Sequence, residues 1–86
     1  MPELCRFRGI VITMYYGDHP PPHFHVRHNE DNAEFSIEDL TIIEGNLSSR
    51  DRRLVYQWAL ARQPELWAAW RRAERDEHPG KIEPLD

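Results

Sequence analysis

The spacing of the hydrophobic residues changes near Gly45, and this change limits the folds open to the chain more than any other feature. Before Gly45, apolar and polar residues alternate, which is typical of strands with one buried face. After Gly45, apolar residues recur every three or four positions, which is typical of amphipathic helices. Strands joined by short turns pair antiparallel, and helices that follow them cover one face of the sheet. The sequence therefore predicts the α+β class.

The first half predicts a small antiparallel β-meander of three to four strands over about residues 6–44. Residues 6–16, RFRGIVITMYY, are rich in β-branched and aromatic side chains and are expected to form the first strand. The remaining strands are expected at 23–28, 33–37 and 40–45, with tight turns at 29–32 and 38–39.

The second half predicts two helices over about residues 49–77, packed on one face of the sheet. Ser48 or Ser49 can cap the first helix, which would extend to about residue 62. Its apolar stripe would comprise Leu54, Val55, Trp58 and Ala61. Pro64 costs roughly 3 kcal/mol inside a helix but is favourable in a first turn, so a second helix is expected at about 64–77. The spacing leaves open whether the helices are continuous at Pro64.

Length, charge and cysteine content further narrow the classes of protein to which the chain could belong. With 86 residues the chain fits one domain, residues 1–86, and its net charge of −4 argues against a general nucleic-acid binder. Its apolar runs are too short for a membrane span and its start lacks a secretory-signal pattern, so a cytoplasmic location is expected. Cys5 is the single cysteine, so packing must hold the fold. The tail at 78–86 is expected to return to the sheet through Ile82 and Leu85.

A dense histidine cluster accompanies a proline-rich loop. The three consecutive prolines at 20–22 stiffen this loop, because each restricts φ. Four of the five histidines fall within ten residues: His19, His23, His25 and His28. The alternation of a strand places His23 and His25 on one face and directs Phe24 and Val26 toward the core.

This cluster leaves several interpretations open. His19, His23 and His25 could bind a divalent metal ion, with Asp18 as a candidate carboxylate ligand. The same histidines could act as general acid and base. The segment could instead contact a partner protein or a base, or the imidazoles could simply pack at the junction of loop and sheet.

A local basic surface on the helices is a second candidate site. Seven of the eleven Lys and Arg residues lie in the predicted helices, so a nucleic acid or an acidic partner could bind there despite the acidic total. The arginines expected to make such contacts are Arg50, Arg53, Arg71 and Arg72.

Several segments together carry a family resemblance: IVITMYYGDHPPPHFHV, AEFSI, IIEG, LVYQWA, ELWAAW and KIEPL. With them the chain resembles the bacterial family called domain of unknown function 4160, marked by a D-H-x-P-P-H-F-H core. The residues that match this core in order are Asp18, His19, Pro21, Pro22, His23, Phe24 and His25. The resemblance implies a small bacterial protein that works with a small protein encoded next door, as in a toxin-antitoxin pair. It implies no reaction, so the interpretations of the histidines stay open.

The leading hypothesis is a cytoplasmic component of a toxin-antitoxin-like module that contacts its protein partner through the histidine-containing loop and strand. The contact residues expected on this surface are Tyr15, Tyr16, Asp18, His19, Pro21, Pro22, His23 and His25. The alternative is a small nuclease-like or metal-dependent enzyme that uses His19, His23 and His25. A third hypothesis is a binding module that uses the helix arginines.

Overall fold

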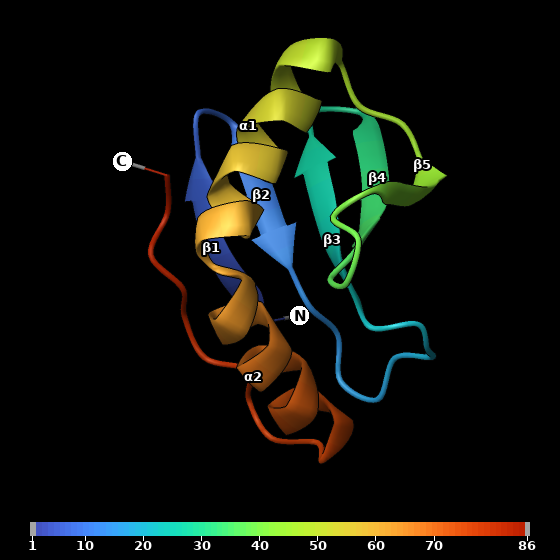
Figure 1. The fold of residues 1–86 in the computed structure, drawn as a ribbon, viewed down its shortest axis with the longest axis vertical. Coiled ribbons are helices and arrows are strands. Elements are labelled where there is room, and N and C mark those ends of the chain that lie inside the picture. Colours follow the sequence, from blue (N-terminus) through green and yellow to red (C-terminus); the bar gives the residue numbers. More distant parts are fainter. Residues whose placement is uncertain (1, 86) are drawn as a thin grey trace.

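The computed structural model describes residues 2–85 and has two layers, a five-stranded sheet and a pair of helices on one of its faces (Figure 1). The strands are β1 (Glu3–Phe7), β2 (Ile10–Thr13), β3 (His23–His28), β4 (Asp31–Ser36) and β5 (Ile42–Gly45). They pair antiparallel in the order β1-β2-β3-β4-β5. The predicted α+β meander is confirmed, with five strands in place of the three to four expected.

The additional strand arises because residues 6–16 do not form a single strand. Arg8 and Gly9 have φ angles of +51° and +83° and make a two-residue turn between β1 and β2. Gly9 suits this turn because a residue without Cβ adopts positive φ at little cost. Phe7 and Ile10 pair across the turn and are both buried, so the turn shifts the alternation by one residue.

Helices α1 (Ser49–Ala61) and α2 (Gln63–Glu74) are separate and meet at Arg62. The Ser48 hydroxyl accepts a hydrogen bond from the Asp51 backbone N–H at 3.1 Å, which caps α1 as expected. Pro64 lies in the first turn of α2, where a backbone N–H has no acceptor within the helix. The N–H that proline lacks therefore costs no hydrogen bond there.

Two details of the helices differ from the prediction. Ala61 is exposed, and Ala59, one turn after Val55, lies in the buried stripe instead. Helix α2 ends at Glu74 rather than near residue 77, because Asp76 adopts a left-handed φ of +60° that cannot continue the helix.

Aromatic side chains fill the space between the sheet and the helices. The Phe24 and Phe35 rings stack at 5.5 Å, and Trp58 from α1 meets Phe24 edge-on at 5.8 Å. The Trp58 Nε1–H donates to the Glu83 carbonyl at 2.7 Å, so the one polar atom of this buried ring is satisfied. Cys5 is also buried, and burial raises the pKa of its thiol to about 12, which excludes a reactive thiolate at neutral pH.

The two edges of the sheet differ in what lies beside them. The C-terminal tail lies along β1, where the Ile82 N–H donates to the Leu4 carbonyl at 3.0 Å and Ile82 is buried, as expected. Strand β5 pairs only with β4, so its other edge has no strand beside it in the described chain. Within residues 2–85, no helix combines the length and the apolar character needed to cross a membrane.

The face of the sheet opposite the helices carries a row of polar side chains. The register aligns the members of this row across β2, β3, β4 and β5: Thr13, His25, Glu34 and Glu44. Phe24 and Val26 are buried in the core, as the alternation predicts. His23, His25 and Arg27 alternate with them along β3 and project from the other face of the strand. The beginning of β3 therefore brings its histidines to this outer face, beside the loop at 14–22.

Candidate functional site

The loop that precedes β3 is held at both ends by backbone hydrogen bonds. The Gly17 N–H donates to the Ala73 carbonyl of α2 at 3.1 Å, and the Ile37 N–H donates to the Pro22 carbonyl at 3.0 Å. Three consecutive prolines further restrict the loop, and the Pro20-Pro21 bond is cis. The loop thus holds Asp18 at a defined position against the start of β3.

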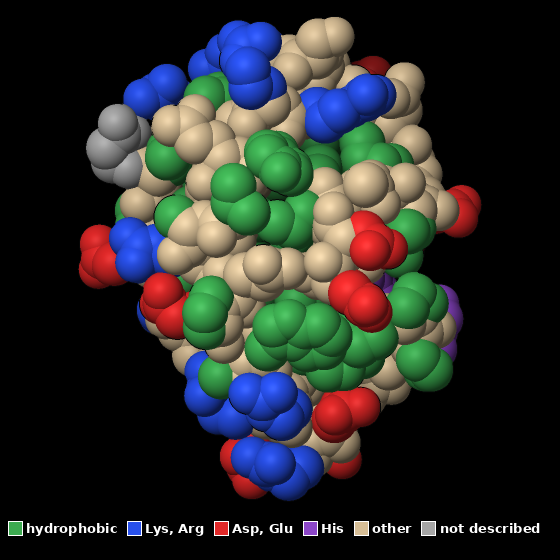
Figure 2. Space-filling view, in the orientation of Figure 1, with side chains coloured by type: hydrophobic (Ala, Val, Ile, Leu, Met, Phe, Trp, Pro, Cys, Tyr) green, Lys and Arg blue, Asp and Glu red, His purple; other side chains and the backbone are tan. Residues whose placement is uncertain are grey.

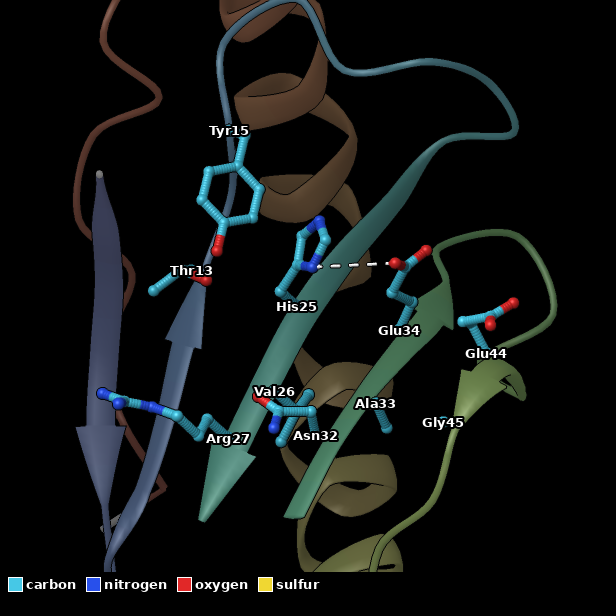
Figure 3. Close-up of a pocket in the computed structure, with 10 residues that line it drawn as sticks. All are labelled: Thr13, Tyr15, His25, Val26, Arg27, Asn32, Ala33, Glu34, Glu44 and Gly45. Carbon is cyan, nitrogen blue, oxygen red and sulfur yellow. Dashed lines mark ion pairs between the residues drawn. The ribbon is translucent and has the colours of Figure 1, made fainter. Parts of the chain in front are cut away.

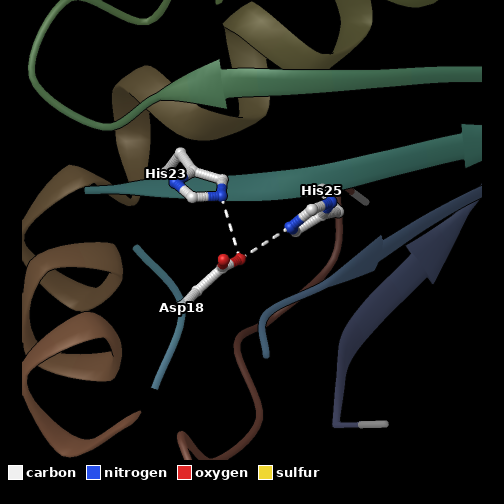
Figure 4. A group of neighbouring side chains, drawn as sticks. All are labelled: Asp18, His23 and His25. Carbon is white, nitrogen blue, oxygen red and sulfur yellow. Dashed lines mark hydrogen bonds and ion pairs between the residues drawn. The ribbon is translucent and has the colours of Figure 1, made fainter. Parts of the chain in front are cut away.

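Asp18, His23 and His25 converge on one point (Figure 4). The Asp18 Oδ2 atom lies 3.0 Å from His23 Nε2 and 3.0 Å from His25 Nε2. Asp18 comes from the loop and the two histidines from alternate positions of β3, so both rings project from the same face of the strand.

His23 is the most enclosed of the three residues, with 1% of its side chain exposed. Its Nδ1–H donates to the Pro21 carbonyl at 2.6 Å, and its ring packs 5.4 Å from the Trp70 ring of α2. Its Nε2 faces Asp18, but with angles that do not make a hydrogen bond, so this buried nitrogen has no hydrogen-bond partner. Because Nδ1 is bonded to the Pro21 carbonyl, Nε2 is the ring nitrogen that faces the cluster.

His25 lies at the rim of the cluster, where it meets a groove on the outer face of the sheet. Its Nε2–H donates to Asp18 Oδ2, and the Tyr15 ring meets its ring edge-on at 4.3 Å. The opposite nitrogen, Nδ1, lies 3.9 Å from Glu34 Oε2 (Figure 3). The groove has a volume of about 250 Å³ and is lined by His25 and Glu34 together with Tyr15, Arg27 and Glu44.

The charge state of Asp18 is set by opposing effects. Burial raises the pKa of this carboxyl, but hydrogen bonds from His25 and from the His19 backbone N–H lower it. Attraction to His23 and His25 lowers it further, so the net pKa lies below its usual value. Asp18 is therefore a carboxylate at neutral pH.

The other predicted site residues lie around this cluster or away from it. The His19 ring is 77% exposed and approaches the second oxygen of Asp18, Oδ1, at 3.0 Å, so it lies outside the convergence point. Tyr16 is 46% exposed. Pro21 and Pro22 lie in the loop directly before β3, and the Pro21 carbonyl accepts the hydrogen bond from His23. His28 lies at the far end of β3, where its Nδ1 bonds with Asp51 Oδ2 at 2.6 Å.

The helix arginines do not gather in one patch. Arg50 and Arg53 lie at the start of α1, and Arg71 and Arg72 near the end of α2, which are opposite ends of the molecule in Figure 2. Arg50 pairs with Asp51 at 2.7 Å, and Arg72 donates to the Pro79 carbonyl, so two of the four guanidinium groups already bind the protein itself.

Glu34 was not among the predicted site residues, although the sequence contains a signal for it. A two-residue turn at Asn29 and Glu30 pairs His28 with Asp31 and therefore His25 with Glu34. The Glu34 carboxylate lies 3.5 Å from His23 Nε2 through Oε1, as well as near His25 through Oε2. A strict reading of the hairpin register would have identified it.

The ligand geometry is compatible with one metal ion. One atom each of Asp18, His23 and His25 can be chosen so that all lie within 4.8 Å of one another. Ligands about 2.0–2.1 Å from a tetrahedral zinc ion lie about 3.3 Å apart, which is close to the 3.0 Å from Asp18 Oδ2 to each histidine Nε2. Two imidazole nitrogens with one carboxylate oxygen suit zinc, iron, cobalt, nickel and manganese ions.

Comparison with known proteins gives a family but no described activity. A family model described as a domain of unknown function (DUF4160) matches residues 9–71, which extend from the turn before β2 into α2. No curated protein and no solved structure matches the chain. The matched span contains the loop, both histidines and Glu34 and covers well over half of the sequence, and on this basis the chain belongs to the DUF4160 family.

Proposed function

We propose that this chain is a small metal-dependent enzyme of nuclease-like, hydrolytic type, with a divalent ion held by Asp18, His23 and His25. The observation that carries the proposal is the convergence of three ligand-type atoms: Asp18 Oδ2 lies 3.0 Å from Nε2 of both His23 and His25, and the buried His23 Nε2 has no hydrogen-bond partner among the described residues. An unsatisfied buried polar atom costs about 1–3 kcal/mol. A metal ion bound at this nitrogen would remove that cost.

The surroundings of both imidazoles support metal binding. A histidine that binds a metal through one nitrogen typically donates the other N–H to a carbonyl or carboxylate, which orients the ring. Pro21 offers such an acceptor to His23, at 2.6 Å, and Glu34 lies 3.9 Å from Nδ1 of His25. Both rings can therefore direct Nε2 toward the same ion without losing a partner for Nδ1.

The chemistry follows from an open coordination position beside a carboxylate. A bound divalent ion lowers the pKa of a coordinated water toward neutrality and so supplies a hydroxide nucleophile. Glu34 is partly exposed to the groove and close to both histidines, which suits it to accept the proton of that water. Attack on a phosphodiester would form a new P–O bond, break the bond to the leaving oxygen and pass the proton to that oxygen.

Metal titration tests the binding step. The full chain, freed of metal with a chelator, is titrated with Zn²⁺, Mn²⁺ and Ni²⁺ by isothermal calorimetry. We expect one ion per chain and a loss of affinity of more than about 100-fold in His25→Ala, because a ligand is removed outright. His78→Ala, at an exposed histidine of the C-terminal tail, is the control and should stay within about twofold. Equal affinity of wild type and His25→Ala would refute the proposed site.

Hydrolysis is tested separately with a fluorogenic single-stranded RNA and with bis(4-nitrophenyl) phosphate, each with added metal and with chelator. The expected result is cleavage only with metal, abolished by His25→Ala and reduced by Glu34→Gln. Metal binding without any cleavage would show that the chain binds metal and would refute the proposed hydrolytic activity. Cleavage that persists in chelator but needs His25 would instead favour acid-base catalysis by the histidines.

A second candidate function is contact with a protein partner in a cytoplasmic toxin-antitoxin-like module. The exposure of Tyr16 (46%) and of the His19 ring (77%), on a loop anchored at both ends, favours it. A rigid loop loses little conformational entropy when a partner binds. Co-expression with the protein encoded next door should change growth, and the double variant Tyr16→Ala/His19→Ala should weaken their co-purification. Unchanged co-purification would exclude this loop as the contact surface, with His78→Ala as the control.

A further inference from the structure

The helix layer covers only part of the inner face of the sheet. A helix with its side chains is about 10 Å wide, whereas five strands span about 19 Å between the outermost strand axes. Helices α1 and α2 follow one another down the molecule rather than lying side by side (Figure 1). The half of the sheet toward β4 and β5 is therefore left without a helix of its own.

A groove lies in this gap, between α1 and β5. It has a volume of about 730 Å³, and its apolar lining includes Phe35, Leu40 and Ile42 from the sheet side. Tyr56 forms the α1 side, is 45% exposed, and is followed one turn later by Leu60, which is 54% exposed. Large apolar side chains exposed in register on one helix mark a contact surface more often than isolated ones do. Figure 2 shows hydrophobic side chains gathered over α1 on this face.

The charged residues that line the groove have a single sign. Arg52 and Arg53 are the charged residues of its lining, although acidic side chains outnumber basic ones, fifteen to eleven, in the whole chain. Neither guanidinium makes a side-chain hydrogen bond or ion pair with any of the residues at 2–85. Arg52 and Arg53 lie four and three residues before Tyr56, and Leu60 lies four residues after it, so these side chains share one helix face.

We infer that this groove binds an amphipathic helix of an acidic protein partner. The apolar face of that helix would occupy the gap beside α1, and its Asp or Glu side chains would pair with Arg52 and Arg53. Helix-in-groove binding uses apolar anchors at this spacing, and charge complementarity selects the partner. The groove lies between α1 and β5 and shares no residue with the cluster of Asp18, His23 and His25, so this inference does not depend on the proposed enzyme.

Peptide display on the immobilised full chain tests the inference. The probe is a library of 16-residue peptides in which apolar residues at helical spacing are fixed and the other positions vary among Glu, Lys, Gln and Ala. The expected result is enrichment of Glu-rich peptides that are helical when bound. The affinity of a selected peptide should fall at least tenfold in Arg52→Glu/Arg53→Glu and in Tyr56→Ala/Leu60→Ala.

Controls separate binding at the groove from other outcomes. The variant Arg71→Glu/Arg75→Glu makes the same change of charge at exposed positions at the C-terminal end of α2 and should bind the peptide with unchanged affinity. All these side chains are exposed, so the variants should keep the thermal unfolding midpoint of the wild type. Enrichment of Lys-rich peptides, or peptides that bind the groove variants normally, would overturn the inference. So would self-association of the wild type that Tyr56→Ala/Leu60→Ala abolishes, since the occupant would then be a second copy of this chain.

Discussion

Strand β3 carries a histidine and carboxylate cluster at each end, and the two clusters differ in how completely their polar atoms are satisfied. At its start, Asp18 faces both His23 and His25, and the buried His23 Nε2 has no hydrogen-bond partner. At its end, His28 bonds with Asp51 at 2.6 Å. The Asp51 carboxylate also accepts from Arg50 at 2.7 Å, and the Asp51 backbone N–H donates to the Ser48 hydroxyl at 3.1 Å.

On this difference we base the interpretation of the first cluster as the candidate metal site and of the second as a joint that holds the fold. Asp51 is 3% exposed at the start of α1, so its carboxylate, bonded to His28, ties the helix to the end of β3. In the Asp18 cluster, by contrast, the buried His23 Nε2 has no hydrogen-bond partner among the described residues. The predictions below test this separation, beginning with the largest expected effect.

Asp18→Asn should weaken metal binding by more than about 100-fold, because the amide keeps the shape of the carboxylate but lacks its charge. Asp51→Asn should leave the metal affinity unchanged within about twofold. Calorimetric titration of both variants with the best-bound ion measures this. A similar loss in both variants would show that the two clusters are not separate.

Asp51→Ala should lower the free energy of unfolding by about 3 kcal/mol. The substitution leaves the partly buried His28 without its partner and removes a negative charge from the helix N-terminus. Urea denaturation measures the change. Asp39→Ala, at an exposed turn, is the control and should stay within about 0.5 kcal/mol. A change below 1 kcal/mol in Asp51→Ala would contradict the structural role.

Glu34→Gln should reduce metal affinity by about 10–100-fold, the usual effect of removing a carboxylate that supports a metal-binding histidine. Glu44 lies directly opposite Glu34 on β5 and lines the same groove, which makes Glu44→Gln a closely matched control. Wild type and Glu44→Gln should bind the metal ion with equal affinity, and Glu34→Gln should bind it more weakly. Equal losses would indicate a general effect of negative charge on the face.

Gly9→Ala should destabilise the fold by about 1–2 kcal/mol, because alanine disfavours positive φ. A Cβ at this position would also lie 2.7 Å from His28 Nε2, so the imidazole would have to move. Gly17→Ala provides the comparison, since φ is +56° there but the nearest contact is an ordinary 3.7 Å. Thermal unfolding should show the larger loss in Gly9→Ala. Equal losses would mean that His28 moves freely.

The smallest expected effect is the dependence of stability on pH through Asp18. Its pKa is lowered in the folded state, so its stabilising contribution is present above the ordinary value of about 3.9 and is lost as pH falls through the lowered folded value. The stability difference between metal-free wild type and Asp18→Asn should therefore be larger at pH 6 than at pH 2.5. A difference that does not change with pH would contradict the lowered pKa.

Local patterns were sufficient for much of the fold. The bounds of β3 and the beginning of α1 follow from alternation and from the Ser48 cap, both of which depend on neighbouring residues alone. The turn at Arg8 and Gly9 was not predicted, because the β-branched residues that follow it favour one continuous strand. The signal was the spacing of Phe7 and Ile10, two core residues three positions apart, which fits a hairpin and not a continuous strand.

For the candidate site, the sequence alone determined that His23 and His25 share one face of a strand and that prolines stiffen the loop before them, because strand geometry and proline act over a few residues. Only the tertiary structure decided that Asp18 joins these histidines while His19 turns to solvent and His28 pairs with Asp51, 23 residues away. These choices depend on how the loop is anchored to α2 and on where α1 begins relative to β3. Contacts between distant segments are set by the packing of the whole domain, which no local pattern encodes.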